Sequence, residues 1–259
     1  MKTLLSFFLL LFIAISANAQ ETNYADLKVT TDSPQALKLY NQGVQDLTSV
    51  KISEADENFA KAIELDPEFM MAHVMVAMGH FYDKNEAQFK TSANKAINSK
   101  ATLNESEKLI QEAMKKLVEN PQADVTEFGE KLVEQNPKSF FAHTVLANFQ
   151  QLAKDTEGAT KTYESMLTLT NDPAPVYNSL GYMYMATNQM DKAKESFEKY
   201  LQADPDNANA YDSMGDYYAK VQDLKNAQQS YMKAYEMDST NFKISHEKAD
   251  KLKLQMAGN

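Results

Sequence analysis

The residues with the most obvious capacity for chemistry are four histidines, at positions 73, 80, 143 and 246. An imidazole can ligate a metal or act as a general base near neutral pH, but a metal site needs at least three protein ligands. The chain has no cysteine, no His-Glu-x-x-His pair and no phosphate-binding glycine loop. We therefore expect no catalytic residue, no metal and no cofactor, unless the fold brings His73 or His80 within reach of two further ligands.

The charge balance narrows the possible partners. All 26 basic residues are lysines, against 36 acidic residues. Without arginine the chain lacks the planar fork that holds a phosphate or carboxylate through two parallel hydrogen bonds. An acidic surface also repels nucleic acid and anionic lipid. We expect a protein or peptide partner, no nucleic acid and no membrane insertion.

The first residues have the pattern of an export signal. Lys2 precedes an apolar stretch over residues 4–15, and Ala17-Asn18-Ala19 supplies the small residues that a signal peptidase recognises. The apolar stretch is too short to span a bilayer. We expect removal of residues 1–19 and a periplasmic or secreted mature chain with a formal net charge of −11, because one lysine lies in the leader.

Small residues recur along the chain at a nearly constant interval. Successive members are 34, 36, 34, 34 and 34 residues apart, at Gly43, Ala77, Ala113, Ala147, Gly181 and Gly215. One unit also shows why a small residue is needed. Tyr177, Gly181 and Tyr184 share one face of a first helix, and Ala193 and Phe197 share one face of a second. A small residue lets the two helices approach, and the aromatic rings fill the space beside the contact.

One unit contains Tyr177, Leu180, Gly181 and Tyr184, followed by Ala193, Phe197 and Pro205. It resembles a tetratricopeptide repeat. The resemblance covers roughly residues 34–240 and is strongest in the last two units. It implies an all-α, right-handed superhelical solenoid of about six hairpins with a C-terminal capping helix. His73 and His143 occupy the position of Tyr177, and His80 that of Tyr184, so we interpret these histidines as packing residues.

Two units depart from the repeat pattern, because they place Phe89 before Ala93 and Val125 before Gly129 where other units place the small residue first. Such an exchange can conserve total volume.

The sequence predicts four divisions of the chain. They are a leader (1–19), a flexible lead-in (20–32), a repeat domain (33–240, with units near 36–69, 70–103, 106–139, 140–173, 174–207 and 208–241) and a capping helix (242–257).

In this family the first helices of successive hairpins line a concave groove, and the resemblance implies that partners bind there. The groove positions carried over from it are Tyr40, Asn41, Val44, Val74, Met75, Met78, Ile110, Gln111, Met114, Asn148, Asn178, Tyr182, Asn209, Asp212 and Asp216. The N-terminal half of this set is apolar and methionine-rich, and the C-terminal half is polar and acidic. It would suit a peptide that is apolar at one end and basic at the other.

Two alternatives stay open at this point. The methionines can instead be core residues that fill gaps between hairpins, which is the commoner role of such stripes. The protein itself can be a non-catalytic scaffold or adaptor outside the cytoplasm, a self-associating assembly module, or an accessory subunit of a cell-envelope complex. Oligomeric state distinguishes self-association from the other roles.

Overall fold

The computed structural model describes residues 23–257, and within that range it contains thirteen α-helices and no strand. The predicted helical-repeat solenoid is therefore confirmed, whereas the leader expected at 1–19 lies outside the described residues. Consecutive helices form six hairpins and a last single helix: α1 (Pro34–Thr48) with α2 (Ile52–Leu65), α3 (Met70–Tyr82) with α4 (Glu86–Ile97), α5 (Glu105–Glu119) with α6 (Thr126–Gln135), α7 (Phe140–Leu152) with α8 (Thr156–Met166), α9 (Ala174–Ala186) with α10 (Met190–Ala203), α11 (Ala208–Lys220) with α12 (Leu224–Met237), and α13 (Lys243–Ala257).

Glycines in three first helices lie directly under an aromatic ring of the second helix. A Cβ atom added to Gly181 would come within 2.3 Å of the Phe197 ring, and one added to Gly43 within 2.6 Å of the Phe59 ring. The repeat therefore needs glycine at these positions because no side chain fits between the helix backbone and the ring. Gly129 in α6 has a different role, since its Cβ would lie 2.9 Å from Leu146 Cα in the following hairpin.

The turns inside five hairpins share one unusual backbone conformation. Val50, Lys84, Lys154, Asn188 and Gln222 all have φ between 58° and 62°, the left-handed region. These residues follow the first helix of their hairpin at equivalent places in the repeat. The α5–α6 hairpin instead has a longer connection, residues 120–125.

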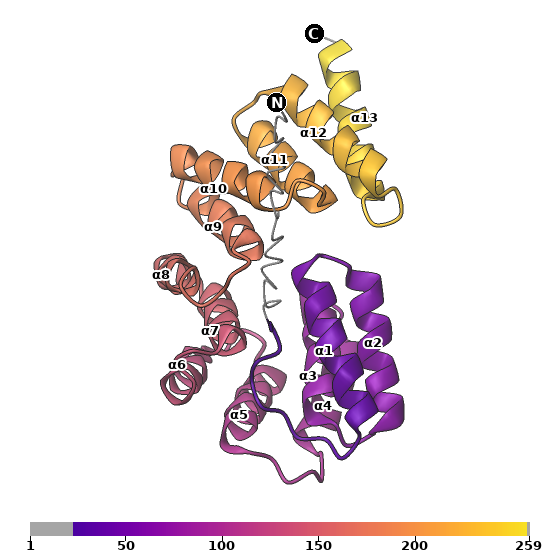
Figure 1. Cartoon of the computed structure of the whole chain (residues 1–259), viewed down its shortest axis with the longest axis vertical. Coiled ribbons are helices and arrows are strands. Elements are labelled where there is room, and N and C mark those ends of the chain that lie inside the picture. Colours follow the sequence, from indigo (N-terminus) through magenta and orange to yellow (C-terminus); the bar gives the residue numbers. More distant parts are fainter. Residues whose placement is uncertain (1–22, 258–259) are drawn as a thin grey trace, which may run out of the picture.

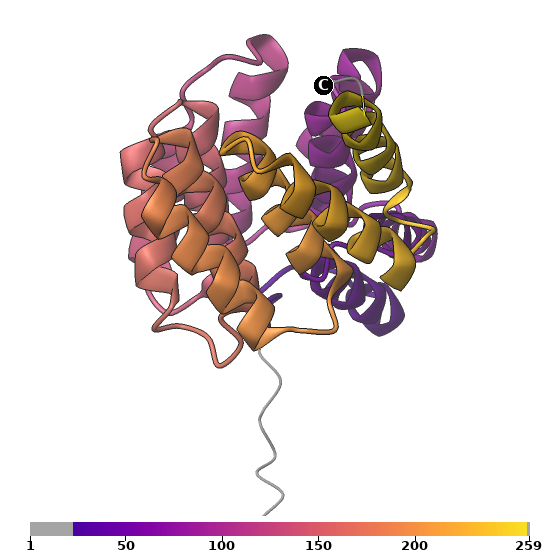
Figure 2. The ribbon, with the colours of Figure 1, turned by 90° about the horizontal axis from the view of Figure 1, so that it is seen from above.

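The hairpins wind round so that the connections before α11 and α13 lie near the turn of the first hairpin. Figure 1 shows α1–α4 on one side and α5–α8 on the other, with α9–α13 across the top. The view from above shows that α12 and α13 return towards the first hairpins (Figure 2). Within residues 23–257 no helix combines the length and the apolar character needed to cross a bilayer.

Candidate functional site

The N-terminal part of the predicted groove is mostly core. Five of its residues expose 6% of their surface or less: Tyr40, Val44, Val74, Ile110 and Met114. Tyr40 packs between the Phe59 and Phe69 rings, with ring centroids 5.9 and 5.2 Å away. Asn41, Met75 and Met78 are half-buried. The structure thus gives Met114 the gap-filling role and leaves Met75 and Met78 partly accessible.

Polar groove positions in the middle of the chain are partly engaged with neighbouring groups. Gln111 donates from Nε2 to the carbonyl oxygen of Ile97, 3.0 Å away at the end of α4. Asn178 Oδ1 accepts from the Ser213 hydroxyl at 2.8 Å, and Asn209 Nδ2 lies 3.2 Å from Tyr200 Oη. Asn148 is half-buried on α7. The Gln111, Asn178 and Asn209 side chains thus join neighbouring helices to one another.

The acidic end of the groove already holds a basic residue of this chain. Lys248 of α13 places Nζ 2.9 Å from Asp216 Oδ1 and 3.5 Å from Asp212 Oδ1. The hydroxyls of Tyr182 and Tyr231 also donate to the Asp216 carboxylate, at 2.9 and 2.6 Å. A basic residue of a partner would therefore have to displace Lys248 from this carboxylate.

Asp212 lies deeper than Asp216 and is bound to α13. It accepts a hydrogen bond from the Ser245 hydroxyl at 2.6 Å. Burial raises the pKa of the Asp212 carboxyl above its usual value, despite the opposing effects of Ser245 and Lys248. The last helix thus covers the end of the groove through polar contacts, as well as through the buried Ala249.

The segment before α1 is packed against the hairpins, which corrects the expectation of a flexible lead-in at 20–32 over its described part. We name residues 23–33 the N-terminal strap. Tyr24 and Leu27 expose only 3% and 5% of their surface and belong to the main hydrophobic core. Figure 1 shows the strap running through the middle of the molecule, between α1 and the α5–α7 side.

The strap begins at the fifth hairpin and crosses the fourth. Tyr24 donates from Oη to Asp172 Oδ2 at 2.6 Å, just before α9. Its ring lies edge-on to Phe140 with centroids 4.9 Å apart. Burial and the hydrogen bond to Asp172 raise the pKa of the Tyr24 hydroxyl, so this group stays protonated as a donor.

Asp26 of the strap binds the beginning of α7. Its carboxylate accepts from the Phe140 amide at 2.7 Å, the Phe141 amide at 3.1 Å and the Ser139 hydroxyl at 2.6 Å. The first amides of a helix have no acceptor within the helix, and the helix dipole favours a negative charge there. Asp26 therefore joins two segments more than a hundred residues apart in sequence.

The strap then contacts the third hairpin and the end of the first. Thr30 donates through its amide to Glu107 Oε1 and through its hydroxyl to Glu107 Oε2, both at 2.6 Å. Glu107 is fully buried and also completes a capping box with Asn104 at the beginning of α5. Thr31 donates to the carboxylate of Asp66, between α2 and α3. The strap thus runs along the repeat in reverse order, from the fifth hairpin to the first.

Comparison with known protein families decides the classification. The tetratricopeptide repeat model matches residues 174–207 and 208–241, which contain the hairpins α9–α10 and α11–α12. The chain is a tetratricopeptide-repeat protein. This fold is a scaffold for protein interactions. No curated protein matches the chain in sequence.

Several solved structures are similar to this repeat protein. A chain of the APC/C hetero-tetramer Cut9-Hcn1 is 16% identical, with a TM-score of 0.49 over 84% of this chain and 42% of that one. This chain therefore spans less than half of that relative. PilW, a widely conserved type IV pilus biogenesis factor, is 14% identical, with a TM-score of 0.49 over 82% and 98%. MamA protein is 20% identical, with a TM-score of 0.44 over 67% and 94%.

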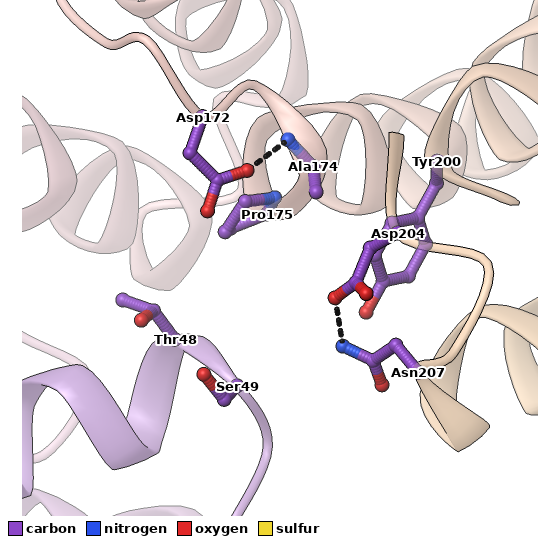
Figure 3. A pocket seen from close by; sticks show the side chains of 8 residues that line it. All are labelled: Thr48, Ser49, Asp172, Ala174, Pro175, Tyr200, Asp204 and Asn207. Atoms are coloured by element: carbon purple, nitrogen blue, oxygen red, sulfur yellow. Dashed lines mark hydrogen bonds between the residues drawn. The ribbon is translucent and has the colours of Figure 1, made fainter. Parts of the chain in front are cut away.

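A polar hollow of about 360 Å³ lies where the first hairpin meets the last two. Its lining comes from the α1–α2 turn and from the connections before α11 and α13. A cavity of about 20 Å³ adjoins it and shares Ser49, Asp204 and Asn207 with it (Figure 3). Asp204 accepts from Asn207 at 2.8 Å, and Asp172 accepts from the Ala174 amide at 3.2 Å. These lining groups bond to each other or to the backbone.

Two of the four histidines, His73 and His143, are buried at the positions that correspond to Tyr177. They bond to the carbonyl oxygens of Pro67 at 2.9 Å and Ser139 at 2.8 Å. Burial lowers the pKa of His73 and so favours its neutral ring. Among residues 23–257 no group of three or more His, Cys, Asp or Glu side chains is arranged to hold a metal ion.

Proposed function

We propose that this protein is a scaffold that holds another protein through a non-helical peptide segment. The segment binds on the inner face of the tetratricopeptide repeats, which is the face that the first helices of the hairpins line. One observation carries the proposal. The inner face already holds a non-helical segment, because the strap binds at the beginnings of α5, α7 and α9 through side-chain and backbone hydrogen bonds. A surface that binds a peptide in this way has the chemistry that a scaffold needs.

We propose further that the protein acts outside the cytoplasm, in the periplasm or after secretion. The support is the sequence of residues 1–19, with a lysine, an apolar stretch and small residues before Gln20. N-terminal sequencing of the protein purified from its own cells tests this part. A chain that begins at Gln20 is expected, and an intact Met1 would contradict export by this route.

Site-directed photo-crosslinking tests the binding role. A crosslinking amino acid at Met75 or Asn148, both half-buried positions of first helices, should capture a partner in whole cells. The matched control places it at Lys194, an exposed position of the second helix α10. Adducts formed at Lys194 and absent from both inner positions would contradict inner-face binding.

The mass of each adduct distinguishes a partner from self-association. An adduct with a different polypeptide supports the scaffold, and mass spectrometry identifies it. Adducts that contain two copies of this chain alone, together with a dimeric mass in light scattering, would replace the scaffold with a self-associating module.

A further inference from the structure

We propose that the strap covers the docking site for the partner and competes with the partner for it. We name this site the track, and it consists of the groups at the beginnings of α5, α7 and α9 that bind the strap. The inference rests on the proposed scaffold function and names the chemistry of the partner. The partner segment is a non-helical peptide with an aromatic residue, a carboxylate two positions later and an apolar residue directly after the carboxylate. This is the pattern of Tyr24, Asp26 and Leu27.

The track recognises this pattern with groups that belong to the hairpins. The carboxylate subsite consists of the Phe140 and Phe141 amides and the Ser139 hydroxyl, all at the beginning of α7. The aromatic subsite lies beside it, where the Phe140 ring meets Tyr24 edge-on and Asp172 accepts the phenol hydrogen. Residues 24 and 25 form a turn, closed by a hydrogen bond from the Ala25 amide to Asn23 Oδ1, and this turn sets the two-residue spacing between the subsites.

A third subsite selects a residue beyond the aromatic, acidic and apolar positions. Glu107 is fully buried, and its two oxygens accept the amide and the hydroxyl of Thr30, four residues after the strap carboxylate. A side chain that brings only acceptors to this place would leave a buried carboxylate facing another acceptor. The partner therefore has a side chain with a hydrogen-bond donor at this position, as the threonine hydroxyl provides in the strap.

The connection of the strap to α1 makes the competition intramolecular. Ser33 caps α1 and Pro34 begins it, so the strap is tethered directly beside its own track. A tethered segment acts at an effective concentration in the millimolar range. A free peptide of equal affinity therefore binds poorly while the strap is docked, and binds well when the strap is weakened.

Fluorescence anisotropy with a labelled peptide tests the proposal. The peptide copies residues 23–33, and the proteins are the full chain and its Y24A/D26A variant. The variant should bind the peptide at least about tenfold more tightly than the parent chain does, because loss of the charged hydrogen bonds releases the strap. D32A is the control, since Asp32 is an exposed strap residue, and it should bind like the parent.

An altered peptide and a milder variant complete the test. A peptide with Asn in place of Asp26 should bind the released variant about tenfold more weakly than the parent peptide. If Y24A/D26A loses its cooperative melt, the milder D26N chain takes its place. Equal peptide binding by parent and released chains, or no binding by a folded released chain, would overturn the proposal.

Two outcomes separate this inference from the scaffold role. Crosslinked capture of a partner at Met75 by a chain that fails every peptide assay would retain the scaffold and overturn the track. Conversion of the parent chain to a dimer by exchanged straps, detected by light scattering at the same protein concentration, would make the occupant a second copy and also overturn it.

Discussion

At the residue scale, the contact between Gly181 and the Phe197 ring defines how close the helices of a hairpin lie. Gly181→Ala should lower the free energy of unfolding by about 1–3 kcal/mol, because the new Cβ would lie 2.3 Å from a ring that is fully buried. Urea unfolding followed by circular dichroism measures this change.

Gly79→Ala in α3 is the matched control, because the nearest atom to its added Cβ is Asp56 Oδ1 at 4.0 Å. Alanine is a better helix former than glycine by about 1 kcal/mol. We expect Gly79→Ala to be neutral or stabilising. Equal losses at the two glycines would show that the contact with the Phe197 ring is not the cause of the loss at Gly181.

The left-handed turn residues also lead to a prediction at this scale. Lys84, Lys154 and Gln222 have φ of 58°, 61° and 62°, where a side chain costs about 1 kcal/mol and glycine does not. Each change to glycine should raise the urea midpoint. Lys90→Gly inside α4 is the contrasting control and should lower the midpoint by a similar amount. A loss of stability at all three turn positions would contradict the assignment.

At the scale of elements, the docking of α13 has a pH-dependent component. Burial raises the pKa of Asp212 in the folded protein, so the folded state binds its proton more tightly than the unfolded state. Stability from this group is present at low pH and is lost as pH rises from about 4 through the raised pKa. Asp212→Asn should therefore raise Tm at pH 7, with a difference that closes as pH falls to about 4.

Asp124→Asn provides a control of opposite sign. The hydrogen bond from the Thr126 amide, 2.9 Å long, holds the pKa of the Asp124 carboxyl below its usual range. Its charge is therefore favoured in the folded state, and the amide should lower Tm slightly at pH 7. A lower Tm for Asp212→Asn at pH 7 would instead mean that the charge pair with Lys248 outweighs burial.

An element could be predicted from the sequence only where its residue types indicate its backbone conformation or its packing partner. Gly181 and Phe197 predicted their contact, because size complementarity within one hairpin is visible in the sequence. The left-handed turns were not predicted, since Lys84 and Gln222 carry no sign of positive φ. The strap was missed because Tyr24 and Leu27 show no helical or strand period, although two apolar residues so close together were a signal of burial.

At the scale of the whole molecule, the 34-residue period predicts a solenoid but not which segments of the chain pack against its inner face. The family resemblance placed Asp216 in an open acidic groove, because a repeat pattern describes each hairpin without the chain ends. In the structure Lys248 of α13 neutralises that end. At the other end, Asp26 of the strap binds α7 across more than a hundred residues of sequence, a contact that no local pattern encodes. The candidate site was therefore only partly predictable.

Amide hydrogen exchange of the full chain tests most directly whether the strap occupies the inner face. The Phe140 and Phe141 amides donate to Asp26 and, as first amides of a helix, have no acceptor within it. We predict that Asp26→Ala speeds their exchange at least about tenfold while Asp32→Ala leaves it unchanged. Identical rates in all three proteins, or exchange of residues 24–31 as fast as in a free peptide, would contradict the account.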